Sequence, residues 1–270
     1  MNPSKRLRLS LGTNGGGLRF AHLFYGAGKR LVRASVDLVY PQRCACCAGT
    51  VEDAAAIPLC FECREQLAPA GLTQCRRCAA VVNPIEQQAG DCARCRTEGF
   101  QFDRAFALAR YEGPLREAVL RMKRSSEEPL MIAMGRLLAH RFSDELQPLQ
   151  PDVVVPVPMH WTRRLVRGTN GPEIMGAVLA RQLQTIFGPR SLRRNRRTRK
   201  LAELTRQERK RTLRDAFSVA RGCDFKDAHV LLVDDVLTTG TTCDTAARAL
   251  MKAGAADVTV LVAARAYPSD

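Results

Sequence analysis

The chain has 270 residues, of which 46% are hydrophobic, and it carries 42 Lys or Arg against 27 Asp or Glu. This apolar content is ordinary for a globular core and too high for a disordered chain. No apolar run approaches the roughly 20 residues that span a bilayer, so we expect a cytoplasmic protein with no membrane insertion.

The positive charge is concentrated in two segments. Residues 1–36 contain seven basic and no acidic side chains, and residues 190–214, the basic strip, contain twelve basic and two acidic ones. Such segments favour a polyanionic partner, either nucleic acid or a phosphate-rich ligand. The alternative interpretation is a solvated helical face with disordered ends.

The first 100 residues divide into a tail and a cysteine-rich region. Residues 1–27 are polar, basic and interrupted by glycines, which predicts a disordered tail. Residues 28–39 carry apolar side chains at helical spacing and predict a short helix. Residues 44–95 hold four CxxC pairs with few apolar residues between them. We therefore expect a helix and a small metal-stapled domain over residues 28–100.

Residues 101–270 alternate apolar strands with amphipathic helices. This order predicts a mainly parallel sheet in a three-layer α/β domain, whose ligand loops follow the carboxyl ends of the strands. In chain order we expect a strand at 104–111, helices at 114–122 and 130–146, a strand at 153–155, a helix at 173–187, a strand at 230–233, a helix at 242–253 and a strand at 258–263.

Eight of the 11 cysteines form the four CxxC pairs. A CxxC turn places two thiolates on one side of a tight knuckle, and two knuckles complete a tetrahedral zinc site. Pairing successive knuckles requires the least loop closure. It gives one or two structural zinc ions, one held by Cys44, Cys47, Cys60 and Cys63 and the other by Cys75, Cys78, Cys92 and Cys95. A cross-braced pairing, disulfides, redox dithiols and an iron–sulfur cluster are the alternatives.

The most informative stretch follows the strand at 230–233. Two acids, Asp234 and Asp235, precede a loop that opens a helix and consists of Thr238, Thr239, Gly240, Thr241 and Thr242. Backbone N–H groups at the helix start and the threonine hydroxyls predict a cradle for a monophosphate, and the carboxylates suit sugar hydroxyls. An ordinary helix cap accounts for one acid and one threonine only. The chain contains neither GxxxxGK[ST] nor GxGxxG, the motifs of other phosphate-binding loops.

This stretch resembles the phosphoribosyl-diphosphate-binding signature of type I phosphoribosyltransferases. The resemblance implies that Asp234 and Asp235 bind the ribose 2′- and 3′-hydroxyls and that residues 238–242 hold the 5′-phosphate. It also implies that Mg²⁺ accompanies phosphoribosyl diphosphate.

Further motifs are similar to those of the ComF family, bacterial proteins linked to competence and DNA uptake, in which cysteine knuckles precede a phosphoribosyltransferase-like domain. The motifs are Pro41-Gln-Arg-Cys44, Tyr111-Glu-Gly-Pro-Leu115 with Lys123 downstream, Val155-Pro-Val-Pro158, and Ala216-Phe217 after the basic strip. The family pattern places Arg163, Arg164 and Arg167 at the diphosphate. The chain departs from this pattern at two places. Family members usually read RGFNQ where this chain has Arg167-Gly-Thr-Asn-Gly171, and they usually have Gln and Asn where this chain has Leu201 and Thr212.

Two functions follow from the resemblance. The first is a ComF-like protein that binds phosphoribosyl diphosphate or a nucleoside monophosphate and acts in DNA uptake or handling, with competence or recombination proteins as partners. Its basic strip would hold single-stranded DNA through phosphate contacts, by Arg193, Arg194, Arg196 and Arg197. The second is an active phosphoribosyltransferase of nucleotide or nucleobase metabolism with no DNA role, in which the strip is a lid over the diphosphate. No residue stands out as a general base, so catalytic residues stay unassigned.

Overall fold

The computed structural model describes residues 42–51, 56–83, 85, 92–97, 99–159, 170–194 and 216–267. The tail and the helix expected at 28–39 lie outside these ranges. The departures from the family pattern at residues 169, 201 and 212 also lie outside these ranges. Five of the predicted site residues do as well, namely Arg163, Arg164, Arg167, Arg196 and Arg197. None of the helices within the described ranges is both long and apolar enough to cross a membrane.

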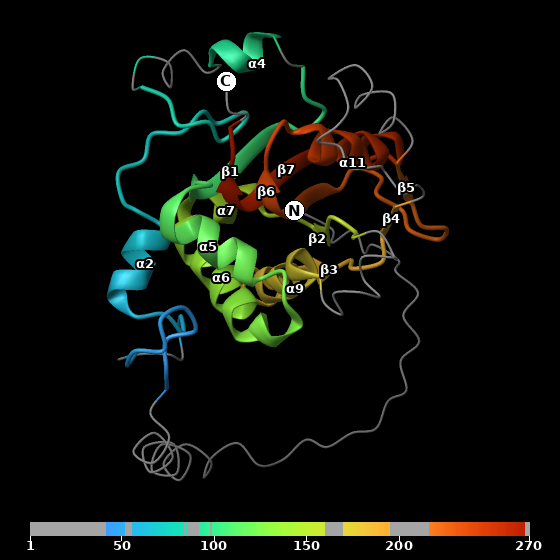
Figure 1. Ribbon diagram of the computed structural model, residues 1–270. Coiled ribbons are helices and arrows are strands. Elements are labelled where there is room, and N and C mark those ends of the chain that lie inside the picture. The colour runs from blue at the N-terminus through green and yellow to red at the C-terminus, as the bar shows by residue number, and fades with distance from the viewer. Residues whose placement is uncertain are drawn as a thin grey trace, which may run out of the picture.

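Five parallel strands form the central sheet (Figure 1). In spatial order they are β1 (Arg104–Arg110), β7 (Asp257–Arg265), β6 (His229–Leu237), β2 (Val153–Pro156) and β3 (Ile186–Phe187). The central strands carry continuous apolar runs, as strands covered on both faces do. The parallel α/β fold predicted from the alternation of strands and helices is confirmed.

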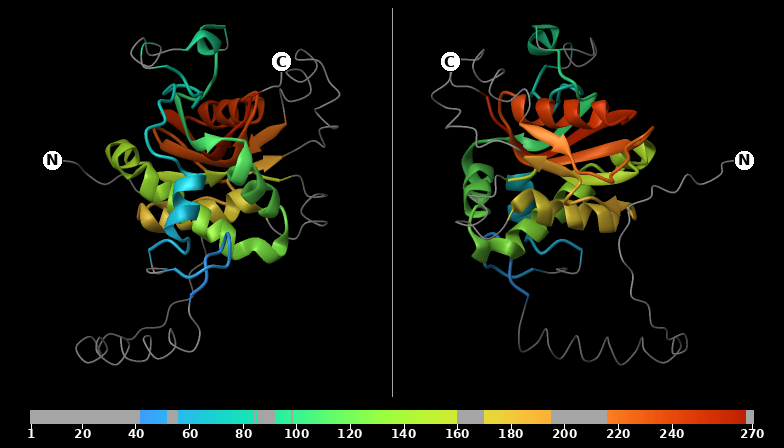
Figure 2. Two further views of the ribbon diagram at one scale, coloured as in Figure 1. Left: turned by 60° about the vertical axis from the view of Figure 1, so that its left-hand side comes forward. Right: turned by 90° about the vertical axis from the view of Figure 1, so that its right-hand side faces the viewer.

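Helices cover both faces of this sheet, which gives the three layers (Figure 2). One face carries α5 (Gly113–Arg121), α6 (Glu128–Arg141), α7 (Ser143–Leu149) and α9 (Gly171–Gln182), with a 3-10 turn at Ser125–Glu127. The other carries α11 (Thr241–Lys252) and an antiparallel hairpin of β4 (Leu192–Arg194) and β5 (Phe217–Val219). Two short helices, α2 (Phe61–Leu67) and α4 (Ala93–Thr97), belong to the cysteine region.

Each face of the sheet has its own hydrophobic core, because alternate residues of a strand point to opposite faces. Val154 and Leu231 pack on the side of α5, α6 and α9. Their neighbours Val155 and Leu232 pack on the side of α11. The loops at the carboxyl ends of β2 and β6 therefore start from strands that are fixed on both faces.

The cysteine region contributes to both cores and passes around the outer edge of β1. Cys44 and Cys63 lie in the core beneath α5 and α6, whereas the later cysteines lie in the core beneath α11. Between them, the Gln74 side chain donates to Ala107 O at 2.8 Å, and the Ala105 N–H donates to Arg76 O at 3.0 Å. This pairing covers an edge strand that would otherwise be open. A domain boundary at residue 100 stays a prediction.

Three predicted elements differ from the structure. The helix expected at 130–146 is two helices, because the backbone breaks at the buried Phe142. The helix expected at 173–187 ends at Gln182, and after a turn with positive φ at Gln184 the chain forms the edge strand β3. The strand expected at 230–233 continues to Leu237, so both acids lie within it.

Candidate functional site

The first and third CxxC pairs form knuckles with the same backbone geometry. The N–H groups of Cys44 and Cys75 both donate at 2.7 Å, to the carbonyls of Gly49 and Ala80. The residues just before these carbonyls have φ angles of 61° and 55°, which turn each knuckle back on itself. The repeated geometry shows two copies of one structural module.

The second and fourth CxxC pairs lie at the starts of short helices. Cys60 is the N-cap of α2, and Cys63 lies in the first turn of that helix. Cys92 directly precedes α4, which contains Cys95. Both modules thus combine a knuckle with a helix start.

The sulfur positions fit two zinc tetrahedra. In each of two four-cysteine groups, all four sulfurs lie within 4.8 Å of one another; the first group is Cys44, Cys47, Cys60 and Cys63, and the second is Cys75, Cys78, Cys92 and Cys95. Individual Sγ–Sγ distances are 3.7 Å in the first group and 3.6 and 3.8 Å in the second. A tetrahedron with Zn–S bonds of about 2.3 Å has edges of about 3.8 Å, whereas a disulfide bond measures about 2.05 Å. The donor set and spacing therefore suit structural zinc, and the groups are the ones that successive pairing predicts.

One thiol in each group ionises more readily than its neighbours. A hydrogen bond from Cys78 lowers the pKa of Cys75 to about 4. Burial opposes ionisation of Cys44, but backbone N–H donors outweigh it and lower its pKa to about 6. Burial and neighbouring thiols raise the pKa of Cys63. A bound cation would drive ionisation of the remaining thiols, so metal binding and thiolate formation occur together.

The two groups differ in exposure, and three cysteines lie outside them. Cys47 is exposed, whereas all four sulfur ligands of the second group belong to buried residues. Cys46 lies in the first knuckle, and its N–H donates to the Cys44 sulfur at 3.4 Å. Cys223 is half-buried, and Cys243 is buried with its thiol 3.8 Å from Asp234 Oδ2. The sequence assigns these three no ligand role, and neither group includes them.

The two acids lie side by side near the carboxyl end of β6. Asp234 Oδ1 accepts the Asp235 N–H at 2.9 Å, and Asp235 Oδ1 accepts the Val236 N–H at 2.8 Å. Burial, with the like charge of Asp235, raises the pKa of Asp234, although Arg194 counteracts this. A cation or hydroxyl donors placed here would relieve the cost of ionising both acids.

Residues 238–242, which the sequence predicts to hold a phosphate and which we call the phosphate loop, lead from β6 into α11. Gly240 is the N-cap of this 12-residue helix, with φ at 80°, a conformation that favours glycine. Thr241 donates its N–H to the Thr239 hydroxyl at 3.4 Å, and the two hydroxyl oxygens are 2.8 Å apart. The first amides of a helix lack intrahelical acceptors and carry the positive end of its dipole. The loop therefore offers hydroxyls and amides to an anion.

A cavity of about 300 Å³ joins the acid pair to the phosphate loop. Its walls come from the carboxyl ends of β2 and β6, the end of α5, the start of α9, and β4. The polar lining residues are Tyr111, Lys123, Asn170, Arg194, Asp234, Asp235, Thr238 and Thr242. Two larger hollows, of about 570 and 1040 Å³, lie elsewhere and contain neither the acid pair nor the loop. Chemistry and not size identifies the smaller cavity as the candidate site.

Lys123 and Asn170 line the candidate cavity, although the sequence did not predict them as site residues. Lys123 lies just after α5, and Asn170 is buried before α9 with its amide 3.4 Å from Val157 O. Both belong to motifs of the family resemblance, Lys123 to the one that begins at Tyr111 and Asn170 to the one at Arg167–Gly171. That resemblance was the signal that could have placed them, because no local pattern brings these segments together.

Two arginines of the basic strip, Arg193 and Arg194, lie on opposite sides of β4. Arg194 lines the cavity, and its guanidinium carbon lies 5.5 Å from the centroid of the Phe217 ring. Arg193 is exposed and pairs across the hairpin with Ser218. Alternation along the strand separates them. Their assignment to DNA stays a prediction, and one of them faces the acid pair.

Two family models match the chain in chain order. The first, "Double zinc ribbon domain", matches residues 35–96, and the second, "Phosphoribosyl transferase domain", matches residues 171–269. "DNA utilization protein YhgH" of Salmonella typhimurium is 30% identical over 218 residues, which cover 75% of this chain and 94% of that protein. The chain belongs to the ComF family. "Competence protein F" of Haemophilus influenzae, 28% identical over 83% of this chain and 97% of its own length, is a further relative with the same span.

Solved structures give weaker likenesses to this ComF chain. A structure titled "Structure of the allosteric regulatory enzyme of purine biosynthesis" has a TM-score of 0.33 and 25% identity, and covers 49% of this chain and 25% of its own. The purine phosphoribosyltransferase of Pyrococcus horikoshii has a TM-score of 0.32 and 18% identity, over 48% of this chain and 77% of its own. The fold assignment therefore rests on the sheet topology itself.

Proposed function

We propose that the chain binds phosphoribosyl diphosphate, or a nucleoside 5′-monophosphate, in the cavity of the acid pair, and that it acts in the uptake or handling of DNA. The observation that carries the binding proposal is the lining of one cavity by an acid pair, two cations and a threonine loop at a helix start. A sugar phosphate has the matching groups, since its hydroxyls suit the carboxylates and its phosphate suits the loop.

Each part of the ligand has proposed partners. Asp234 and Asp235 would accept hydrogen bonds from the ribose hydroxyls, and residues 238–242 would hold the 5′-phosphate. Arg163, Arg164 and Arg167 are proposed for the diphosphate on the family pattern. Mg²⁺ bound together with phosphoribosyl diphosphate would add positive charge beside Asp234, whose ionisation burial opposes.

The DNA role rests on the relatives and on the charge of the chain. Relatives covering most of this chain carry the names "Competence protein F" and "DNA utilization protein YhgH". The basic strip, with a net charge of +10 from twelve basic and two acidic residues, suits single-stranded DNA or a competence or recombination complex containing it. We further propose a cytoplasmic location, because the two four-cysteine groups need reduced thiols.

Active phosphoribosyl transfer is the second candidate, and the position of Arg194 in the cavity favours it. In that reaction a nitrogen nucleophile bonds to the ribose carbon as the bond to the diphosphate breaks. The chain would hold the ribose and stabilise the departing diphosphate with guanidinium and backbone donors. Under this candidate the strip is a lid and needs no DNA.

Calorimetry with phosphoribosyl diphosphate and Mg²⁺ tests the binding proposal. Asp234→Ala with Asp235→Ala should weaken binding by roughly 1.5 to 3 kcal/mol for each lost charged hydrogen bond. Asp144→Ala with Glu145→Ala, an exposed neighbouring acid pair on α7, is the matched control and should bind as the wild type does. Equal affinity of all three proteins removes this cavity from the proposal.

Consumption of labelled phosphoribosyl diphosphate in the presence of pooled nucleobases separates the two candidates. The binding protein should leave it intact, whereas the transferase should consume it with release of diphosphate.

A further inference from the structure

One buried arginine connects the second zinc module to the phosphate loop. Arg265, the last residue of β7, is 1% exposed. Its Nε donates to Cys78 O at 2.9 Å, and its Nη1 donates to Leu237 O at 2.6 Å and also to Thr238 O. Cys78 belongs to the second four-cysteine group, and Thr238 begins the loop. Because a buried guanidinium requires such acceptors, each segment helps to fix the other.

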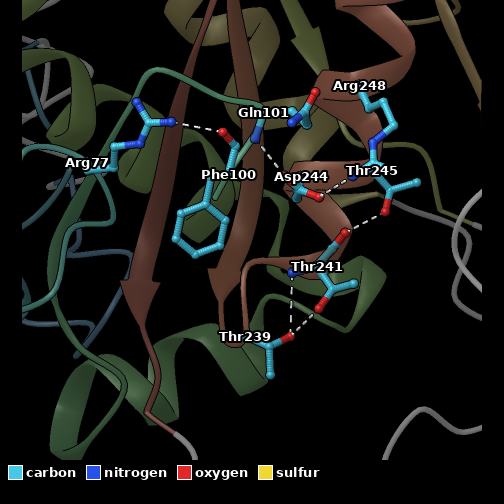
Figure 3. Close-up of polar contacts among 8 residues, drawn as sticks. All are labelled: Arg77, Phe100, Gln101, Thr239, Thr241, Asp244, Thr245 and Arg248. Carbon is cyan, nitrogen blue, oxygen red and sulfur yellow. Dashed lines mark hydrogen bonds and ion pairs between the residues drawn. The ribbon is translucent and has the colours of Figure 1, made fainter. Parts of the chain in front are cut away.

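A second connection runs through residues 99–102, directly after the second four-cysteine group (Figure 3). The Gln101 N–H donates to Asp244 Oδ1 at 2.6 Å, and Asp244 lies in the first turn of α11. Arg77, which lies between Cys75 and Cys78 in the sequence, donates a hydrogen bond to the Phe100 carbonyl at 2.9 Å. The Phe100 ring also lies over Gly240, where a Cβ would come within 2.6 Å of it. Two sets of contacts, one through Arg265 and one through residues 99–102, therefore connect the phosphate loop to the second four-cysteine group.

The first four-cysteine group makes its contacts on the opposite face of the sheet. Arg121 of α5 donates to Cys46 O at 2.5 Å and to Ala45 O at 3.2 Å. Cys44 and Cys63 pack in the core beneath α5 and α6. The two modules share one geometry but serve different cores, so the first module is a natural control for the second.

We propose that the second four-cysteine group, when it holds its metal, positions the phosphate loop, with Arg265 and Asp244 as the positioning residues. This inference rests on the proposed function insofar as the loop binds a phosphate. Loss of the metal unfolds the knuckle that contains Cys75 and Cys78, because the free energy of metal binding in such modules is largely their free energy of folding. Arg265 then loses the Cys78 carbonyl, and residues 99–102 lose their anchor, so the loop gains freedom that an anion must remove on binding.

Two variants of Asp244 separate positioning from charge. Asp244→Asn removes the negative charge but keeps an oxygen that can accept the Gln101 N–H. Asp244→Ala removes both. Since a negative charge near a helix start disfavours a bound anion, charge alone would make both variants bind phosphoribosyl diphosphate with Mg²⁺ more tightly. Positioning predicts that Asp244→Ala binds about tenfold more weakly while Asp244→Asn does not weaken binding. Equal affinities of the two variants would overturn the role of Asp244.

Hydrogen exchange tests the coupling without any ligand. In the full-length chain prepared with zinc, amides of residues 237–245 should exchange about tenfold faster in Cys92→Ser with Cys95→Ser, which loses the second metal site, than in the wild type. The matched variant, Cys60→Ser with Cys63→Ser, should leave them unchanged. Unchanged exchange in the former, or equal acceleration in both, overturns the proposal.

If loss of the second group unfolds the whole sheet, amides of β2 will also exchange faster, and a milder variant is then needed. Arg265→Lys keeps the charge but cannot reach three carbonyls in the same geometry. It should accelerate exchange in residues 237–245 and hasten zinc release to a chelator from the second group only. Wild-type exchange and zinc release in this variant would overturn the proposal.

The linkage is reciprocal, which separates failure of this inference from failure of the proposed function. Phosphoribosyl diphosphate with Mg²⁺ should slow zinc release from the second group and leave the first unaffected. If the ligand does not bind the wild type, the proposed function fails, and the exchange experiment still decides the coupling. If the ligand binds but affects zinc release from neither group or from both alike, the proposed function stands and the coupling fails.

Discussion

Ionising the carboxyl group of Asp234 costs the folded protein free energy. This group is partly buried next to Asp235, and both conditions favour its neutral form, so its pKa is raised from a usual value near 3.8. A group whose pKa is raised by folding stabilises the fold fully below its unfolded pKa and loses that contribution as the pH rises through its folded pKa. The proposed contact with ribose hydroxyls would offset this cost when a ligand binds.

Asp234→Asn should therefore stabilise the protein at neutral pH. The amide keeps an acceptor for the Asp235 N–H but does not ionise. The thermal midpoint should match that of the wild type near pH 4, at the usual pKa of the acid, and exceed it increasingly as the pH rises towards 7. Circular dichroism melts across this range measure the difference, and a gap independent of pH would contradict the argument.

Gly240 has a positive φ angle and lies against the Phe100 ring, and both features disfavour a side chain at this position. Gly222 shares only the first feature, so a comparison of the two glycines separates the two effects. Gly240→Ala should lose about 1–2 kcal/mol for its positive φ and about 1–3 kcal/mol more for the clash with Phe100. Gly222 has φ at 85° but nothing within 4 Å of an added Cβ, so Gly222→Ala should lose the first amount only. Urea unfolding of both variants gives the comparison. Equal losses would mean that the Phe100 ring does not constrain the loop.

Among the elements, those with strong local patterns were predictable and those set by tertiary contacts were not. The strands at 104–110 and 257–265 and the helix at 241–252 follow from apolar periodicity and the glycine after the helix. The break at Phe142 and the short edge strand β3 leave no comparable pattern, because packing against the sheet decides them. The β4–β5 hairpin was not predicted, since its strands are separated by a long basic segment.

The site divides in the same way. Asp234, Asp235 and the threonine loop are consecutive in sequence and could be recognised as a motif. Lys123 and Arg194 reach the cavity from distant segments, through the crossover connections of a parallel sheet. No pattern within one segment could have predicted that meeting.

The two zinc modules should release their metal at different rates because their exposure differs. The first group includes the exposed Cys47, whereas the second consists of buried residues. A chelator should therefore remove zinc in two phases, with the fast phase from the first group. In Cys60→Ser with Cys63→Ser the fast phase should disappear and the slow phase remain. A colorimetric metal indicator follows both phases, and loss of the slow phase instead would reverse the assignment.

At the scale of the whole molecule, the two modules tie opposite faces of one sheet together around β1. Each module completes the core on its own face, so neither core is closed by the α/β elements alone. The candidate cavity lies at the carboxyl ends of the strands, and β4, which belongs to the basic strip, contributes Arg194 to its lining. The arginines proposed for a nucleic acid and for a diphosphate therefore include neighbours on the same strand of the hairpin.

That hairpin allows the two uses of the charge to be separated by single substitutions. Arg193 is exposed and Arg194 lines the cavity, although they are adjacent in sequence. If the strip binds single-stranded DNA, Arg193→Ser should reduce the slope of log affinity against log salt by about 0.7 for one lost phosphate contact and leave phosphoribosyl diphosphate binding unchanged. Arg194→Ser should weaken phosphoribosyl diphosphate binding by about 1.5 to 3 kcal/mol with little effect on that slope. Arg194→Lys should recover part of the lost affinity because it restores the charge.

Fluorescence anisotropy with a labelled oligonucleotide over a salt series measures the slope, and calorimetry measures phosphoribosyl diphosphate binding. If Arg193→Ser leaves the salt slope unchanged while Arg194→Ser abolishes diphosphate binding, the hairpin serves the cavity, and the transferase candidate replaces the DNA-handling one.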